Sequence, residues 1–174
     1  ATEDGKVLIS FTVSTASFVS GNNCIAVEVH QNSVSSSDLS FDLELIAKPA
    51  AASTYLINYG ATWKYLDNGS DQGTAWKDST FNDASWASGA GQLGYGDADE
   101  ATVVSFGGNS ANKYITTYFR KKINFNPASF GSVTGNIKRD DGCVIYVNGQ
   151  QVFINNLTAP VNFGSLAANA ADDG

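Results

Sequence analysis

Cysteine, basic residues and long apolar runs are scarce in this sequence, and each scarcity excludes a class of protein. The two cysteines, Cys24 and Cys143, lack the CxxC spacing of a thiolate metal site. Each lies in an apolar strand pattern, which favours two buried free thiols over a disulfide. No apolar run approaches the roughly 20 residues of a membrane-spanning helix. No signal peptide opens the sequence, so we expect that it was removed or that the chain begins downstream of it.

Positive charge is scarce because 10 Lys and Arg residues face 17 Asp and Glu residues, for a formal net charge of −7. This balance argues against nucleic acid and anionic membranes as partners, since both are bound through basic patches. It is compatible with binding cations or neutral sugars. The chain has 174 residues, of which 43% are hydrophobic, enough for one domain over 1–174 with a buried core.

Alternation of apolar and polar residues, the pattern of a half-buried strand, recurs along the chain and is clearest over 39–46. The predicted strands are 6–13, 24–30, 39–46, 55–59, 62–66, 114–125, 131–138, 143–147 and a return strand from Val152. One helical turn is expected near 83–86, and other helix signals are nearly absent. Many short strands separated by turn signals predict an all-β fold, an antiparallel β-sandwich.

A predicted hairpin over 139–153 carries the strongest candidate site. Asn148-Gly149 predicts a type I′ turn, which needs positive φ at both central residues. At the front of the hairpin, Asp140 and Asp141 lie side by side with Gly142 behind them, where a strand begins at the rim of a sheet. Packing gives no reason to place two like charges together, so we interpret this rim as a binding site.

The long segment 67–99 is expected to be an ordered excursion that aromatic residues fix to the sandwich. Trp63, Trp76 and Trp86 are expected to be core anchors rather than sugar-stacking platforms. Tyr95, between two glycines, is the better candidate for an exposed aromatic residue.

Two further acidic groups lie in turn-rich stretches of the chain. Neither has the regular spacing of an EF-hand loop, so solvated turns are favoured for both over a structural Ca²⁺. The first group is Asp67, Asp71, Asp78 and Asp83, and the second is Asp97, Asp99 and Glu100.

Motifs spread over nearly the whole chain resemble those of a single family. They run from Trp63 to Trp76, Phe81 to Trp86, Gln92 to Asp97, Ile115 to Arg120, Arg139 to Gly142, and Asn23 to Asn32 with Ser37 to Leu45. The family is the galactose-binding-like jelly-roll module of large secreted bacterial proteins. Such modules accompany phosphoesterases, polysaccharide-degrading enzymes and adhesins. The resemblance implies a secreted β-sandwich accessory domain and does not fix a ligand.

The order of these motifs departs from the family. Residues 1–47 resemble the family's C-terminal strands placed in front, followed by a linker over 48–54 and the remainder of the sandwich over 55–174. A circular permutation that closes its own sandwich is favoured over a piece cut from a repeat array. We therefore expect Ala1 and Gly174 to be neighbours, and strand 24–30 to share a sheet with strand 143–147.

The hairpin with Asp140 and Asp141 is also similar to that of protective-antigen-type sugar-binding modules, in which an Asp pair holds Ca²⁺ that binds sugar hydroxyls. If strand 24–30 runs antiparallel to 143–147, its end brings more oxygen ligands to this rim. The expected Ca²⁺ ligands are Asp140, Asp141 and Asp38, and the expected ligand-binding residues are Asp140, Asp141, His30, Gln31, Asn32 and Tyr95. The alternative is that Asp140 caps turn amides or pairs with Arg139 or Arg120.

No nucleophile motif or Ser-His-Asp arrangement follows from the spacing, and a carboxylate pair for glycoside hydrolysis is a three-dimensional property. His30 and Glu28 are expected on a polar sheet face, with Glu28 paired to Arg120. The sequence predicts a non-catalytic, secreted module that binds a polysaccharide or cell-surface glycan, beside neighbouring domains of a multidomain protein. A structural or adhesive spacer is the alternative, and a hydrolase is the weakest one.

Overall fold

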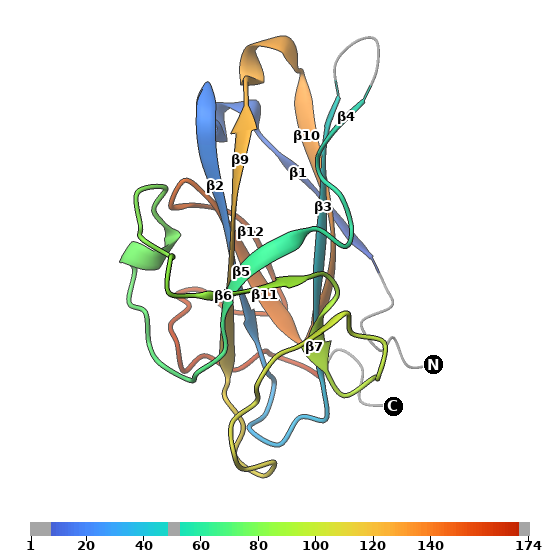
Figure 1. Ribbon diagram of the computed structural model, residues 1–174, viewed down its shortest axis with the longest axis vertical. Coiled ribbons are helices and arrows are strands. Elements are labelled where there is room, and N and C mark those ends of the chain that lie inside the picture. Colours follow the sequence, from blue (N-terminus) through green and yellow to red (C-terminus); the bar gives the residue numbers. More distant parts are fainter. Residues whose placement is uncertain (1–7, 49–52, 171–174) are drawn as a thin grey trace.

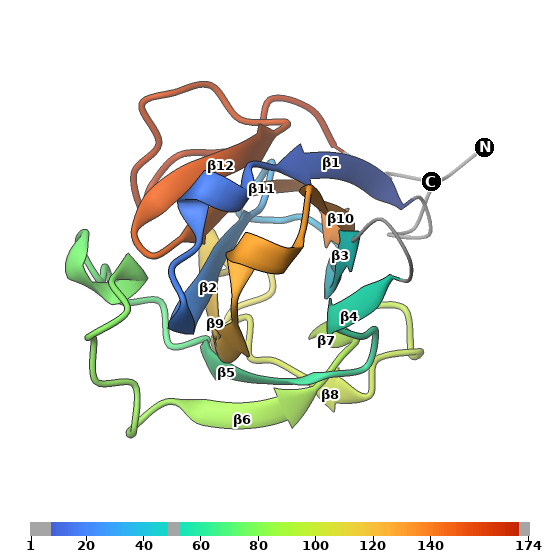
Figure 2. The same ribbon diagram turned by 90° about the horizontal axis from the view of Figure 1, so that it is seen from above.

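A computed structural model describes residues 8–48 and 53–170 of the chain. The described residues form twelve β-strands and three short 3-10 helices, with no α-helix among them. The strands make two six-stranded sheets, which face each other as two layers in Figures 1 and 2. This arrangement confirms an all-β architecture of the sandwich type.

The first sheet has the order β1-β10-β3-β7-β8, with β4 also paired to β3. Its pairs are antiparallel except for β7 and β8, which run parallel, so the sheet is mixed and not purely antiparallel. Its strands are β1 (Ile9–Val13), β10 (Ser132–Asp140), β3 (Leu39–Lys48), β4 (Thr54–Ile57), β7 (Leu93–Tyr95) and β8 (Thr102–Val103).

The second sheet has the order β12-β11-β2-β9-β5-β6, and all of its pairs are antiparallel. Its strands are β12 (Gln150–Asn155), β11 (Gly142–Val147), β2 (Gly21–His30), β9 (Thr116–Phe125), β5 (Thr62–Leu66) and β6 (Ala87–Ala90). In this sheet β2 lies between β11 and β9.

The main core lies between the two sheets because each strand sends alternate side chains inward. On β3, Phe41, Leu43 and Leu45 are buried in this core, whereas Asp42 and Glu44 alternate with them and face outward. Transfer of such apolar side chains from water supplies the main stabilisation of the fold.

A second apolar cluster covers the outer face of the second sheet. Trp76 and Trp86 pack there on Tyr118 and Tyr146, with 4.7 Å between the ring centroids of Trp76 and Tyr118. The loop 67–86 supplies both tryptophans. The three tryptophans of the chain are at most 5% exposed, as expected of core anchors.

The predicted pairing of strand 24–30 with strand 143–147 is confirmed. Gly142 lies opposite His30 and Val147 lies opposite Ile25 in an antiparallel register. Strands β1, β2 and β3 pair with later strands of this same chain, so the described part of 1–47 completes both sheets. The expected closeness of Ala1 and Gly174, residues 6–7 of the first predicted strand and most of the linker lie outside the described residues.

Three short strands in the long segment 67–99 and just after it, β6, β7 and β8, were not predicted. The expected helical turn at 83–86 is instead a hydrogen-bonded turn in which Trp86 N donates to Asp83 O, and the nearby 3-10 helix is Ala75–Lys77. The predicted hairpin turn is present, with φ of 51° at Asn148 and 84° at Gly149. The two cysteines are buried free thiols, as expected.

Candidate functional site

The rim of the sheets brings most of the predicted site residues together. Asp141 joins β10 to β11, and its Oδ2 accepts hydrogen bonds from Asn32 N at 2.7 Å and Ser36 Oγ at 3.4 Å. Gln31 Nε2 donates to Asp38 O at 3.0 Å and to Tyr95 Oη at 2.6 Å. The loop after β2 is therefore tied to Asp141 by two hydrogen bonds and to Tyr95 through Gln31.

These rim residues are buried. Asp140, Asp141 and Gln31 are each at most 1% exposed, and Asp38 is 6% exposed. Burial, with the nearby charges of Asp38, Asp140 and Asp141, raises the pKa of Tyr95. The phenol therefore stays neutral and acts as a hydrogen-bond acceptor for Gln31.

The expectation that Tyr95 is an exposed aromatic residue is wrong, because its side chain is only 5% exposed. The flanking glycines, Gly94 and Gly96, allow the backbone of β7 to lie close to residues 38–40. They do not expose the tyrosine ring. A Cβ at Gly94 would lie 1.9 Å from Leu39 O, so only glycine lets β7 lie this close to β3. The Lys113 ammonium lies 5.0 Å from the centre of the Tyr95 ring.

Lys113 also donates hydrogen bonds to the carbonyls of Ser36 and Ser37. Its ammonium group therefore binds backbone oxygens of the loop after β2. The bond from Asn32 N gives Asp141 a capping role of the kind that the alternative assigned to Asp140. Calcium at Asp140, Asp141 and Asp38 stays a prediction.

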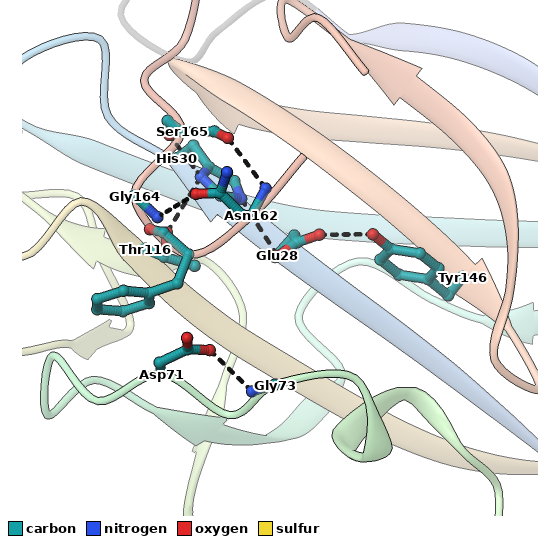
Figure 3. Close-up of polar contacts among 10 residues, drawn as sticks. Glu28, His30, Asp71, Gly73, Thr116, Tyr146, Asn162, Gly164 and Ser165 are labelled. Carbon is teal, nitrogen blue, oxygen red and sulfur yellow. Dashed lines mark hydrogen bonds and ion pairs between the residues drawn. The ribbon is translucent and has the colours of Figure 1, made fainter. Parts of the chain in front are cut away.

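His30 lies on the outer face of the second sheet, because its neighbour Val29 on β2 faces the core, and it lies beside Glu28 (Figure 3). Glu28 Oε1 accepts a hydrogen bond from Tyr146 Oη at 2.6 Å, and Glu28 Oε2 lies 3.3 Å from His30 Nε2. The predicted pairing of Glu28 with Arg120 is wrong. Arg120 lies opposite Ala26 and donates to Asp83 Oδ2 at 2.9 Å instead.

The other nitrogen of His30 ties a later segment to the sheet. Nδ1 lies 2.8 Å from Ser165 O and 3.0 Å from Thr116 Oγ1, and Thr116 donates to Phe163 O at 2.6 Å. Because a carbonyl oxygen only accepts, the geometry requires a proton on Nδ1. His30 therefore cannot take a proton from Thr116, although the two groups are in contact.

Between this segment and the loop 67–86 lies a cavity of about 160 Å³. Glu28 forms part of its wall and is itself 5% exposed. Figure 3 shows Asp71 and Gly73 on one side of the Glu28 and His30 pair, and Asn162 close beside His30. The lining residues are Glu28, Asp71, Gly73, Thr74, Trp76, Lys77, Tyr118, Val161, Asn162 and Phe163.

The wall of this cavity combines aromatic rings with few charges. Trp76 and Tyr118 are buried, whereas Asn162 and Asp71 are exposed at its edge. The Lys77 ammonium lies 4.2 Å from the centre of the Tyr146 ring. Burial and the charge of Glu28 raise the pKa of Tyr118, which keeps its hydroxyl neutral.

The two other acidic groups behave differently from each other. In the first, Asp71 Oδ1 accepts from Gly73 N at 2.8 Å, as expected of a turn, whereas Asp67 Oδ2 accepts from Ser105 N, a residue far along the chain. Asp83 departs from that expectation because it pairs with the buried Arg120. In the second group, Asp97, Asp99 and Glu100 place ligand atoms within 4.8 Å of one another, and no other acidic trio in the described residues does so.

Sequence reasoning missed several residues of the cavity. Tyr118 and the adjacent residues Asn162 and Phe163 come from two separate stretches of the chain, and no local motif connects the two stretches. Tyr118 carries one usable signal, since it alternates with the core residue Phe119 on a strand and so must face outward.

The part of the chain that the structure describes contains no helix with the length and apolar character needed to cross a membrane. The comparisons with known proteins add no relative: no family model, no curated protein and no solved structure matches this chain.

Proposed function

We propose that this chain is a non-catalytic glycan-binding module whose site is the cavity around Glu28. The observation that carries the proposal is the combination of the buried Glu28 carboxylate, the exposed carboxylate of Asp71, the ammonium group of Lys77 and several aromatic rings in one small cavity. Sugars present hydroxyl groups that donate to carboxylates and apolar ring faces that pack on aromatic side chains.

The size of the cavity favours a single sugar unit. The volume of the cavity is about 160 Å³. It is smaller than the 300–1,000 Å³ or so of sites for drug-sized ligands. A terminal or branching sugar of a polysaccharide is therefore a better match than an extended internal stretch.

Binding is favoured over hydrolysis because the His30 imidazole beside Glu28 and the Thr116 hydroxyl in contact with it, which do not line the cavity, are held in fixed hydrogen bonds. The Nδ1–H of His30 donates to Ser165 O, and the hydroxyl of Thr116 donates to Phe163 O. Neither group is therefore arranged for nucleophilic or general-base chemistry.

The expected location, fold family and attachment role of the module are proposed as well. We propose that the module is secreted, belongs with galactose-binding-like jelly rolls and attaches neighbouring domains to a polysaccharide or cell surface. The two-sheet architecture and the acidic balance of the chain support this. Calcium at the rim is a separate proposal, since the cavity around Glu28 does not include Asp38, Asp140 or Asp141.

Affinity electrophoresis through gels that contain neutral glucans, galactans or soluble chitin derivatives tests the proposal. We expect retardation in at least one gel and a loss of about tenfold in affinity in Asp71→Asn or Lys77→Ala, equal to about 1.4 kcal/mol. Asp78→Asn, on the same loop but outside the cavity, is the matched control. Absence of retardation in every gel would reject glycan binding and favour a structural spacer. Loss of binding in Asp141→Asn alone, with an unchanged melting temperature, would move the site to the rim.

A further inference from the structure

We propose that the module carries a second sugar-binding site on the opposite face of the sandwich, so that one chain can cross-link two glycan strands. This inference rests on the proposed function. The second site is a cavity of about 450 Å³ lined by Leu8, Asp42, Tyr59, Gln92, Asp99 and Lys138. Its volume falls within the range of roughly 300–1,000 Å³ that is usual for small-molecule sites.

The strand register places this cavity on the outer face of the first sheet. Lys138 of β10 lies directly opposite Asp42 of β3. Their neighbours Ile137 and Leu43 are buried in the core between the sheets, and successive side chains of a strand point to opposite faces. The cavity around Glu28 lies on the outer face of the other sheet, so the whole sandwich separates the two.

A chain of hydrogen bonds forms the polar wall of the second cavity. Lys138 Nζ donates to Gln92 Oε1 at 3.1 Å. Gln92 Nε2 donates to Asp99 Oδ1 and to Ser40 Oγ, each at 3.1 Å. The amide of Gln92 is thereby fixed in one orientation, which prepares it to recognise hydroxyl groups.

Asp42 contributes a buried carboxylate to the same wall. It is 5% exposed, and its oxygens accept from Leu43 N at 2.8 Å and Gly60 N at 2.9 Å. Gly91 leaves room for this carboxylate, because a Cβ there would lie 2.5 Å from Asp42 Oδ1. Each carboxylate oxygen has capacity for a further donor, such as a sugar hydroxyl.

Two exposed side chains supply the apolar part of the cavity. Tyr59 is 37% exposed and Leu8 is 46% exposed, so both belong to the exposed large hydrophobic residues of the described part of the chain. Burial and the charges of Glu44 and Asp42 raise the pKa of Tyr59 to about 12, so its hydroxyl is neutral at physiological pH. An open tyrosine ring beside fixed amide and carboxylate groups suits a neutral sugar.

Two sites on opposite faces give the module a property that one site cannot give. A chain bound to two strands of a polysaccharide bridges them, and many such bridges turn a soluble polysaccharide into a network. Light scattering of a polysaccharide solution therefore reports the second site, whereas gel retardation reports any binding at all.

The test uses whichever neutral polysaccharide retards the wild-type chain in the gel. We expect that polysaccharide to scatter more light when the wild-type chain is added. The variants Tyr59→Ala and Lys77→Ala, one for each face, should each remove the scattering and keep part of the retardation. The double variant should lose both. Tyr55→Ala, a substitution of a 54% exposed tyrosine outside the second cavity, is the matched control and should behave as wild type.

The outcomes separate the two proposals. Retardation without scattering, unchanged in Tyr59→Ala, would overturn the second site and leave the proposed function in place. Retardation that depends on Tyr59 alone would overturn the Glu28 cavity as the site and keep the cavity around Asp42. Lack of retardation by any polysaccharide would overturn both.

Discussion

Tyr146 and His30 hold the Glu28 carboxylate in place, and the orientation of this one side chain shapes the proposed site. Glu28 bonds to a hydroxyl on the neighbouring strand β11 and lies beside an imidazole on its own strand. Both partners come from the sheet, so the carboxylate is positioned by the most rigid part of the fold. The loops around it supply only the rest of the cavity wall.

We expect Tyr146→Phe to lower the free energy of unfolding by about 1.5–3 kcal/mol, because a buried carboxylate oxygen loses its hydrogen-bond donor. Urea unfolding monitored by fluorescence measures the change. Tyr55→Phe removes a hydroxyl from a tyrosine that is 54% exposed, and it should change stability by no more than about 0.5 kcal/mol. Equal effects of the two substitutions would contradict the role of Tyr146.

Cys143 makes stability depend on pH in the alkaline range. Burial raises the pKa of its thiol from 9.0 to about 12. Between these values the unfolded thiol loses its proton while the folded thiol keeps it, so stability falls as pH rises. The expected contribution is about 1.4 kcal/mol per pH unit at most. Unfolding of the wild type and of Cys143→Ala at pH values above 9 measures it: the wild type should lose stability more steeply, and parallel curves would contradict the assignment.

At the scale of elements, the buried side chain of Arg120 anchors the loop 67–86, in addition to the packing of Trp76 and Trp86 on the sheet. Arg120 of β9 donates to the carboxylate of Asp83 and to the carbonyls of Trp76 and Asp78. Arg120 is fully buried, so these bonds satisfy a charge that water cannot reach. This anchor holds one wall of the proposed glycan site.

We expect Arg120→Met to destabilise the fold by about 3–5 kcal/mol, because it leaves the Asp83 carboxylate without its cation. Limited proteolysis of the variant should cut first within 67–86. Lys122→Met, which replaces an exposed cation two residues along the same strand, is the control. A variant that is destabilised without any new cleavage in this loop would contradict the anchoring role.

The turn between β11 and β12 depends on the glycine at its second central position. Gly149 has a φ of 84°, and a Cβ there would lie 2.7 Å from Asp78 Oδ1. Gly149→Ala should therefore cost about 1–2 kcal/mol of stability, as a strained backbone position does. Gly108→Ala, at a site with open space for a Cβ, is the comparison in thermal unfolding. Equal melting temperatures for the two variants would contradict the strain.

The regular elements were the predictable part of this chain. Strand β3 was found because apolar and polar residues alternate over 39–46 of the sequence, and β11 was found because the Asn148-Gly149 turn fixes where it ends. Strands β6, β7 and β8 are two to four residues long. Such short strands give no detectable period, and only their pairing partners make them strands.

The candidate site was predictable only in part. The pairing of β2 with β11 correctly placed Asp141, Gln31 and Asn32 at one rim. The sequence could not show that this rim is packed and buried, since burial depends on loops such as the one that carries Lys113. The Glu28 cavity needs contacts between residues more than 80 positions apart, for which the chain has no local signal.

On the scale of the whole molecule, two sheets closed by the chain's own first strands leave two outer faces for recognition. One face carries the cavity around Glu28 and the other carries the cavity around Asp42. The rim with the Asp pair lies at the end of the sandwich, where the binding of a metal ion would change the stability of the fold. If Ca²⁺ binds at Asp38, Asp140 and Asp141, it acts on the fold as a whole.

For that rim we expect millimolar Ca²⁺ to raise the melting temperature and a chelator to reverse the gain, because a ligand that binds only the folded state stabilises it. Asp38→Asn should remove the response, and Asp78→Asn, an exposed residue away from the rim, should keep it. Identical melting curves with Ca²⁺ and with chelator would exclude a calcium site at this rim.

Glycan binding in the Glu28 cavity is tested most directly by nuclear magnetic resonance. The isotope-labelled chain is titrated with methyl glycosides of glucose, galactose and N-acetylglucosamine. Binding predicts saturable shifts of the backbone amides of Gly73, Lys77 and Asn162 with at least one of these sugars. If those amides do not move with any sugar, or if the shifts are confined to residues 31–38, the account is contradicted.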